Sequence, residues 1–202
     1  MYIYMMGQKY RRHGYRKTAG YILHPYSFIL VAIVLLLHSC AAANRIPQAG
    51  NTRMVEDVPF YSQEAYQCGP SSLAGVLKYW GIDVTPDEIA KEIFSESARG
   101  TLNIDIVLYA QRKGLNAVQY RGTIEDLKKN IDLGYPALVL VDYGFSLYQA
   151  NHFMVVVGYN EHGVIVNSGK KRELFISEED FLKAWGKANY WTLLIRPVSG
   201  KH

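Results

Sequence analysis

The sequence is poor in cysteine, since only Cys40 and Cys68 occur among its 202 residues. The two stand in segments of different character, so no disulfide framework is expected and each cysteine needs its own explanation. Acidic residues are absent from positions 1–27, which instead carry five Lys and Arg residues. The apolar run that follows, 28–37, has only ten residues, whereas a helix that spans a bilayer needs about twenty. A basic segment followed by a short apolar one predicts a secretory signal.

The end of this segment, Leu37-His38-Ser39-Cys40, resembles the lipobox of bacterial lipoproteins. The resemblance implies cleavage before Cys40 and lipidation of its sulfur, so the mature chain is expected to be anchored to a membrane. An uncleaved N-terminal anchor is the alternative, and Met5 or Met6 is an alternative start. Ala41, rather than Asp, follows the cysteine. This resembles outer-membrane sorting and predicts a lipid-anchored protein of the bacterial cell envelope that faces the periplasm.

Charge outside the predicted signal is nearly balanced. The whole chain has 22 basic and 18 acidic residues and a net charge of +4. Removing residues 1–39 takes away five basic residues and no acidic ones, which leaves 17 against 18. The basicity therefore belongs to the targeting segment, and no nucleic-acid partner is expected. We predict a signal over 1–39, a lipidated cysteine and linker over 40–53, and a single domain over 54–198.

The local sequence signals in the predicted domain change from helix to strand about halfway along. Helix signals dominate its first half, where apolar positions recur at helical spacing between capping residues and glycines. Continuous apolar segments separated by turn signals follow, which predicts strands. Helices first and an antiparallel sheet afterwards indicate an α+β fold with a cleft between the two halves. We expect helices at 68–79, 86–95, 103–113, 124–133 and 178–185, and strands at 55–61, 117–120, 136–141, 153–159, 164–166 and 190–195.

Cys68 lies where a loop turns into the first of these helices, in the run QEAYQCGPSS. Pro70 just inside the helix, with Ser71 and Ser72 beside it, is typical of a helix start. Backbone N–H groups and the helix dipole stabilise a thiolate at this end, so Cys68 is a candidate nucleophile. A buried, inert cysteine is the alternative and the more common fate of a free thiol.

Nucleophilic catalysis by cysteine needs a base and a group that orients this base. The domain and its tail offer His152, His162 and His202. His202 ends the chain and His162 sits in a hairpin turn, whereas His152 begins the apolar strand HFMVVVGY. Asn167 follows fifteen residues later, across one hairpin, and is expected to orient the His152 ring. The alternatives are turn chemistry for Asn167 and an ordinary solvated or hydrogen-bonded side chain for His152.

Gln63, on the loop before Cys68, is expected to donate its amide to an oxyanion together with the Cys68 N–H. Gln67 is the competing donor. The candidate catalytic set is therefore Cys68, His152, Asn167 and Gln63. One free cysteine and one histidine do not make a four-ligand zinc site, and the sequence has no GxxxxGK[ST] phosphate-binding loop. Neither a metal nor another cofactor is expected.

These motifs together resemble the bacteriocin-processing peptidase family, family thirty-nine of the cysteine peptidases, within the papain-like superfamily. The matching features are Gln63, Cys-Gly-Pro at 68–70, HFMVVVGY at 152–159 and a polar residue after the hairpin. The resemblance spans about residues 54–197. It is strongest to a lipoprotein subgroup with VPF at 58–60 and a Tyr-Trp strand at 190–191.

By position, the resemblance implies a papain-like fold with a helical half that carries the cysteine and an antiparallel sheet that carries the histidine. It implies Cys68 as nucleophile, His152 as general base and acid, and Gln63 in the oxyanion hole. The family usually has Asp, often followed by Pro, where this chain has Asn167 and Ser168. Papain-like enzymes also use Asn at this position.

The resulting expectation is a membrane-anchored cysteine peptidase that acts on a peptide or protein substrate. Tyr143, Phe145 and Tyr148, in the loop before His152, are candidates for lining the cleft or for ordinary packing. Family peptidases often sit on ATP-driven exporters, so a separate exporter is a candidate partner. The alternatives are a non-catalytic peptide-binding lipoprotein on the same fold, a thiol amidase or acyltransferase acting on cell-wall material, and a secreted domain with a structural cysteine.

Overall fold

The computed structural model describes residues 51–62, 67–146 and 148–198, all within the compact unit Asn44–His202. The predicted signal, Cys40, most of the linker and Gln63 lie outside these residues. The fold is α+β, as predicted, with an antiparallel sheet. Its helices are α2 (Cys68–Tyr79), α3 (Pro86–Ile93), α4 (Asn103–Arg112), α5 (Ile124–Asp132) and α6 (Glu178–Lys187). Its strands are β1 (Arg53–Met54), β2 (Phe94–Ser95), β3 (Gly100–Thr101), β4 (Leu115–Arg121), β5 (Ala137–Asp142), β6 (Asn151–Asn160), β7 (Gly163–Ser168), β8 (Lys171–Ser177) and β9 (Trp191–Pro197).

Helix α2 is the most deeply buried helix, with every residue from Gly69 to Leu77 buried. It has the predicted bounds, and Gly81 follows it with a φ of 81°, a conformation that favours glycine. Gly75 lets the helix approach the entry segment closely, because a Cβ at this position would lie 2.5 Å from the carbonyl oxygen of Pro59. The middle of α2 therefore packs directly against the backbone of the entry segment.

Local signals determine several other helix ends. Thr85 caps α3 in a reciprocal capping box with Glu88, and Thr123 caps α5 by accepting from the backbone N–H of Asp126. Helix α4 begins at the expected residue, Asn103, although Leu102 occupies the N-cap position and makes no side-chain capping bond. Thr101, directly before this N-cap, belongs to the short β2–β3 hairpin, which the sequence analysis missed.

The main sheet has the strand order β4-β9-β5-β6-β7-β8, with β1 paired to β6, and every pairing in it is antiparallel. All six residues of β5 are buried, as expected for a continuous apolar strand near the middle of a sheet. Strand β8, with the sequence KRELFIS, was not predicted. Its charged residues suit its position at an edge of the sheet, where one side of the backbone is unpaired.

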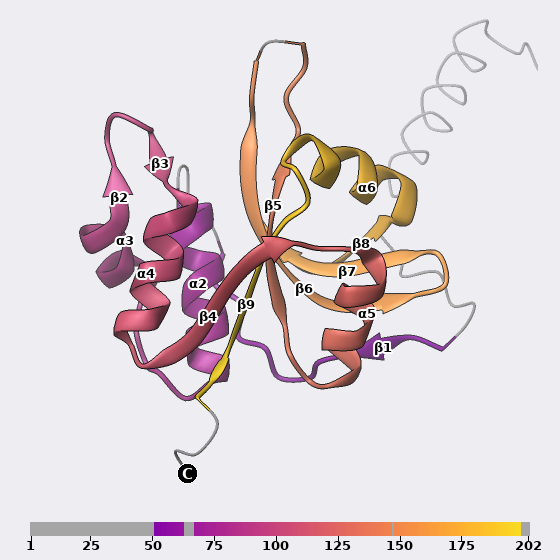
Figure 1. The fold of residues 1–202 in the computed structure, drawn as a ribbon, viewed down its shortest axis with the longest axis horizontal. Coiled ribbons are helices and arrows are strands. Elements are labelled where there is room, and N and C mark those ends of the chain that lie inside the picture. Colours follow the sequence, from indigo (N-terminus) through magenta and orange to yellow (C-terminus); the bar gives the residue numbers. More distant parts are fainter. Residues whose placement is uncertain (1–50, 63–66, 147, 199–202) are drawn as a thin grey trace, which may run out of the picture. The chain divides into compact units, whose positions relative to one another are not determined.

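Helices cover the sheet on two sides (Figure 1). Helices α2, α3 and α4 gather on one side, and α5 and α6 lie on the other. A hydrogen bond of 3.3 Å from the Ser72 hydroxyl to the Phe153 carbonyl joins α2 to β6. Since Cys68 begins α2 and His152 is the second residue of β6, this contact ties together the two elements that carry the predicted nucleophile and base.

No helix in the described part of the chain combines the length and the apolar character that a transmembrane helix needs.

Candidate active site

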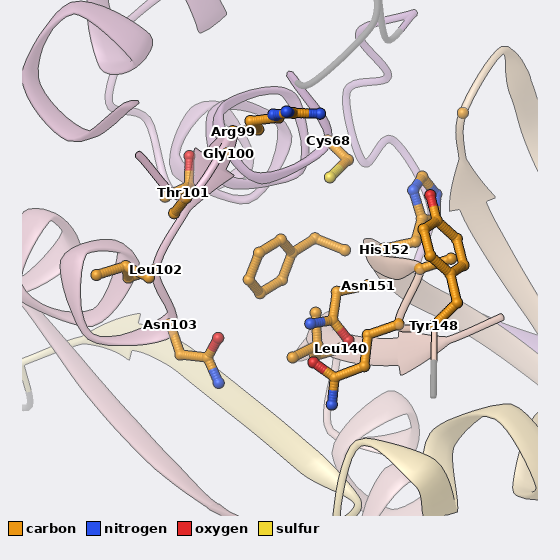
Figure 2. A pocket seen from close by; sticks show the side chains of 15 residues that line it. Cys68, Arg99, Gly100, Thr101, Leu102, Asn103, Leu140, Tyr148, Asn151 and His152 are labelled. Atoms are coloured by element: carbon orange, nitrogen blue, oxygen red, sulfur yellow. The ribbon is translucent and has the colours of Figure 1, made fainter. Parts of the chain in front are cut away.

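Cys68 and His152 line the same pocket, which has a volume of about 750 Å³. Figure 2 shows Cys68 and His152 among the side chains around the pocket, with Thr101, Leu102 and Asn103 across from Asn151 and Tyr148. Residues 98–103, from the β2–β3 hairpin and the start of α4, form one wall, and residues 148–153 form the opposite wall. The structure therefore brings together, from positions 84 residues apart in the sequence, the two residue types that thiol catalysis requires.

Burial dominates the ionisation of both groups. It raises the pKa of the Cys68 thiol, although hydrogen bonding to the backbone of Phe153, Gly69 and Cys68 itself acts in the opposite direction. It lowers the pKa of the His152 imidazole. Both shifts favour the uncharged forms of the two groups. This differs from the sequence expectation of a thiolate stabilised by the helix dipole, because the cost of burying a charge exceeds the stabilisation from the backbone.

The His152 ring is held by Ser168. Its Nε2 atom lies 2.9 Å from the Ser168 hydroxyl oxygen, at the end of β7. Ser168 is buried, with 9% of its surface exposed. Tyr143 lies beside the same imidazole, with 6.3 Å between the ring centroids. With Nε2 engaged by Ser168, the other ring nitrogen, Nδ1, is available to face the thiol.

Asn167 does not orient His152, in contrast to the prediction. Its Oδ1 atom accepts a hydrogen bond of 3.0 Å from the backbone N–H of Glu173. Glu173 has a φ of 53° and lies where the β7–β8 pairing shifts register. The side chain of Asn167 thus satisfies the backbone of an irregular edge strand, a structural role that resembles turn chemistry.

A bulge in β6 explains why the prediction chose the wrong neighbour. Asn160 pairs with Gly163 and Gly158 pairs with Ile165, but beyond the bulge Val155 pairs with Asn167. The register shift by one residue places Asn167 on the face of Val155, which is opposite to the face of His152. Without the shift, Asn167 would share the face of His152.

The structure describes only one of the two glutamines predicted as oxyanion donors. Gln67 donates from Nε2 to the Asp87 carboxylate at 3.2 Å, so its amide is engaged with α3 at the surface. Gln63 lies outside the described residues.

The loop between β5 and β6 is built around Asp142. One carboxylate oxygen of Asp142 accepts from the backbone N–H groups of Gly144, at 2.7 Å, and Ala150, at 2.8 Å. These bonds lower the pKa of the carboxyl group. Lys187 of α6 also donates to the Gly144 carbonyl at 2.7 Å. The base of the loop is therefore fixed next to the start of β6, where His152 lies.

The three aromatic residues of this loop differ in position. Tyr148 lines the Cys68 pocket, Tyr143 lines a second pocket next to it, and Phe145 is 86% exposed and lines neither. His162 lies in the β6–β7 turn beside Glu161, with 3.4 Å between its Nε2 atom and a Glu161 carboxylate oxygen. The residues described contain no group of three or more His, Cys, Asp and Glu side chains placed to hold a metal ion.

Comparison with known proteins identifies the family and the fold. Residues 55–192 match the model of the Peptidase_C39 like family. An uncharacterized protein of Methanothermobacter thermautotrophicus is 28% identical over 131 residues, which cover 65% of this chain and 84% of that protein. An uncharacterized protein of Methanothermobacter marburgensis is 27% identical, with coverage of 63% and 82%.

Two solved structures share the fold. A protein of Bacillus anthracis described as a C39-like peptidase has a TM-score of 0.61 at 20% identity, covering 74% of this chain and 99% of that one. A double glycine motif protease from an AMS/PCAT transporter, solved in complex with the leader peptide, has a TM-score of 0.58 at 24% identity, covering 73% and 99%. At these identities the likeness establishes the fold and leaves the chemistry to the residues of this chain.

Proposed function

This chain belongs to the Peptidase_C39 like family, and on that basis we propose that it is a cysteine peptidase that hydrolyses peptide bonds by acyl transfer through Cys68. The main support for the proposal is the pocket that Cys68 of α2 and His152 of β6 both line. The Nε2 atom of His152 is hydrogen-bonded to Ser168. Nucleophile, base and orienting group are the three parts that this chemistry needs. Ser168 takes the orienting role that the sequence suggested for Asn167.

In the first step, the sulfur of Cys68 forms a bond to the carbonyl carbon of the scissile peptide. His152 acts as general base and takes the thiol proton at Nδ1, while Nε2–H donates to Ser168. This tautomer follows from the roles of the two nitrogens. Because burial favours a neutral thiol and a neutral imidazole, proton transfer accompanies the attack.

The tetrahedral oxyanion needs hydrogen-bond donors. We assign this role to the backbone N–H of Cys68 and to the Gln63 amide, since the amide of Gln67 is held by Asp87. The intermediate collapses when the C–N bond breaks and His152 returns its proton to the leaving amine. Water then attacks the thioester, His152 again takes a proton, and the acid product leaves with regeneration of the thiol.

The proposal includes anchoring through a lipid on Cys40, which rests on the lipobox-like Leu37-His38-Ser39-Cys40 and the basic segment before it. A lipid anchor would place the peptidase at the cell envelope, on the outer membrane and facing the periplasm. A peptide or protein brought there, with or without a separate exporter, would be its substrate. Radiolabelled palmitate incorporation into wild type, and its loss in Cys40→Ala, tests this part independently of the active site.

Incubation of the full chain with a diverse peptide mixture, followed by mass spectrometry, tests the activity. We expect new peptide termini with wild type, and none above background with Cys68→Ala or His152→Ala. Gln67→Ala is a matched control in the same loop and should retain cleavage. A folded wild-type protein that produces no new termini would favour a non-catalytic peptide-binding protein. Cleavage that persists in Cys68→Ala would place the chemistry elsewhere.

A further inference from the structure

A second pocket, with a volume of about 590 Å³, lies directly beyond His152. It shares Ala150, Asn151, His152 and Gly169 with the Cys68 pocket, but Cys68 does not line it. Its remaining lining residues are Tyr143, Ser168, Lys170, Lys171 and Leu174. The imidazole therefore stands between two pockets, one that contains the nucleophile and one that does not.

This arrangement assigns the second pocket to the leaving-group side of the scissile bond. In acyl transfer the general acid must lie next to the amine that departs, because it gives that amine a proton. His152 is this acid in the proposed mechanism. A pocket that adjoins His152 without touching Cys68 is thus positioned to hold residues that follow the scissile bond.

The charged side chains that line the second pocket are basic. Lys170 and Lys171 line it, and none of its described lining residues is acidic. Neither lysine forms an ion pair with another described residue. The neighbouring carboxylate of Glu173 is bound to Arg172 at 3.0 Å. The two positive charges are consequently available to a ligand.

The lysines are also held at a defined position. They lie in the β7–β8 turn, in which Ser168 pairs with Lys171 and Gly169 has a φ of 59°. The same turn carries the hydroxyl that binds His152. Tyr143 and Leu174 supply apolar surface beside the charges. The turn therefore places the backbone of the two lysines next to the residue that holds the base.

We propose that this pocket is a subsite for a carboxylate on the leaving-group side of the substrate, held by Lys170 and Lys171. The carboxylate belongs either to an acidic side chain shortly after the scissile bond or to the C-terminus of a short leaving segment. The inference rests on the proposed peptidase function and specifies one property of its substrate.

The test uses the full chain and the peptides that it cleaves best in the diverse mixture. Each is resynthesised in matched forms, with Glu or Gln at the first two leaving-group positions and with a free or an amidated C-terminus. The variant Lys170→Gln/Lys171→Gln removes the two charges. The control, Lys91→Gln/Lys183→Gln, removes two charges from exposed residues on α3 and α6 that line neither pocket.

We expect one of the two carboxylates to raise kcat/KM about fivefold over its neutral counterpart, as for a favourable exposed ion pair. The Glu/Gln pair reports the side chain and the acid/amide pair reports the C-terminus. The preference should disappear in Lys170→Gln/Lys171→Gln and persist in the control. Cleavage without an acid preference, or a preference that survives in the pocket variant, overturns the subsite alone. No Cys68-dependent cleavage overturns the peptidase proposal and the subsite with it.

Discussion

The imidazole Nε2 of His152 lies 2.9 Å from the hydroxyl oxygen of Ser168. A hydroxyl can fix the orientation and the tautomer of an imidazole, but it brings no negative charge to stabilise an imidazolium. This agrees with the pKa of His152, which burial lowers without an opposing acidic neighbour among its causes. The pair thus defines an uncharged base that is oriented by a neutral group.

Removing the Ser168 hydroxyl should weaken catalysis through the orientation of His152. We expect Ser168→Ala to lower kcat about fivefold, because a neutral hydrogen bond contributes about 1 kcal/mol. Ser168→Asp would restore an acceptor and add a negative charge, which raises the pKa of His152. The acid limb of the kcat pH profile should then move to higher pH. An unchanged profile in Ser168→Asp would contradict a positioning role for this residue.

Asn167 should matter for stability more than for chemistry. Its side chain is buried and its Oδ1 accepts from the Glu173 N–H. We expect Asn167→Ala to lower the free energy of unfolding by about 1 kcal/mol, because the partly buried N–H of Glu173 loses its partner. Urea unfolding measures this, and kcat per folded molecule should stay within about twofold of wild type. A large loss of kcat with unchanged stability would restore the catalytic role predicted from sequence.

Alkylation of Cys68 should require high pH. Since burial raises its pKa, the rate of iodoacetamide labelling should have a midpoint above the value of about 8.5 for a free thiol. His152→Ala should not raise that midpoint, because the neutral imidazole does not stabilise a thiolate. Cys68→Ser provides the correction for labelling of Cys40. A midpoint well below 8.5 that is lost in His152→Ala would instead demonstrate a thiolate–imidazolium pair.

The buried imidazole should make the domain sensitive to acid. In the unfolded chain His152 has a pKa of about 6.5, and in the folded chain burial lowers it. Between the two values the unfolded state binds more protons, so this contribution to stability is complete above about pH 6.5 and is lost as the pH falls. Urea titrations between pH 7 and pH 5 should show a steeper loss of unfolding free energy for wild type than for His152→Gln.

The two glutamines near the nucleophile should differ in their contribution to turnover. If Gln63 donates to the oxyanion, Gln63→Ala should lower kcat about a hundredfold. Gln67→Ala should change kcat less than about twofold, because its amide is already bound to Asp87 at the surface. Single-turnover measurements with a cleaved peptide distinguish these outcomes. A reversed order would assign the oxyanion contact to Gln67.

Much of the secondary structure and part of the site could be predicted from sequence because the signals are local. Pro70 and the small residues around it predicted the start of α2, and Thr123 and Gly134 predicted the ends of α5. Continuous apolar runs predicted β5, β6 and β7. Edge strand β8 was missed because it begins with three charged residues directly after a turn sequence, and charged residues are depleted in strands.

From the sequence alone it was possible to predict the helix that begins with Cys68, the strand that carries His152 and the α+β class of the domain. Two properties depended on the tertiary structure. One is the charge state of the site, because desolvation arises from atoms distant in sequence that enclose Cys68 and His152. The other is the partner of His152, because the extra residue at the β6 bulge shifts the register by one and exchanges Asn167 for Ser168 on the catalytic face. A side-chain period of two makes that single residue decisive.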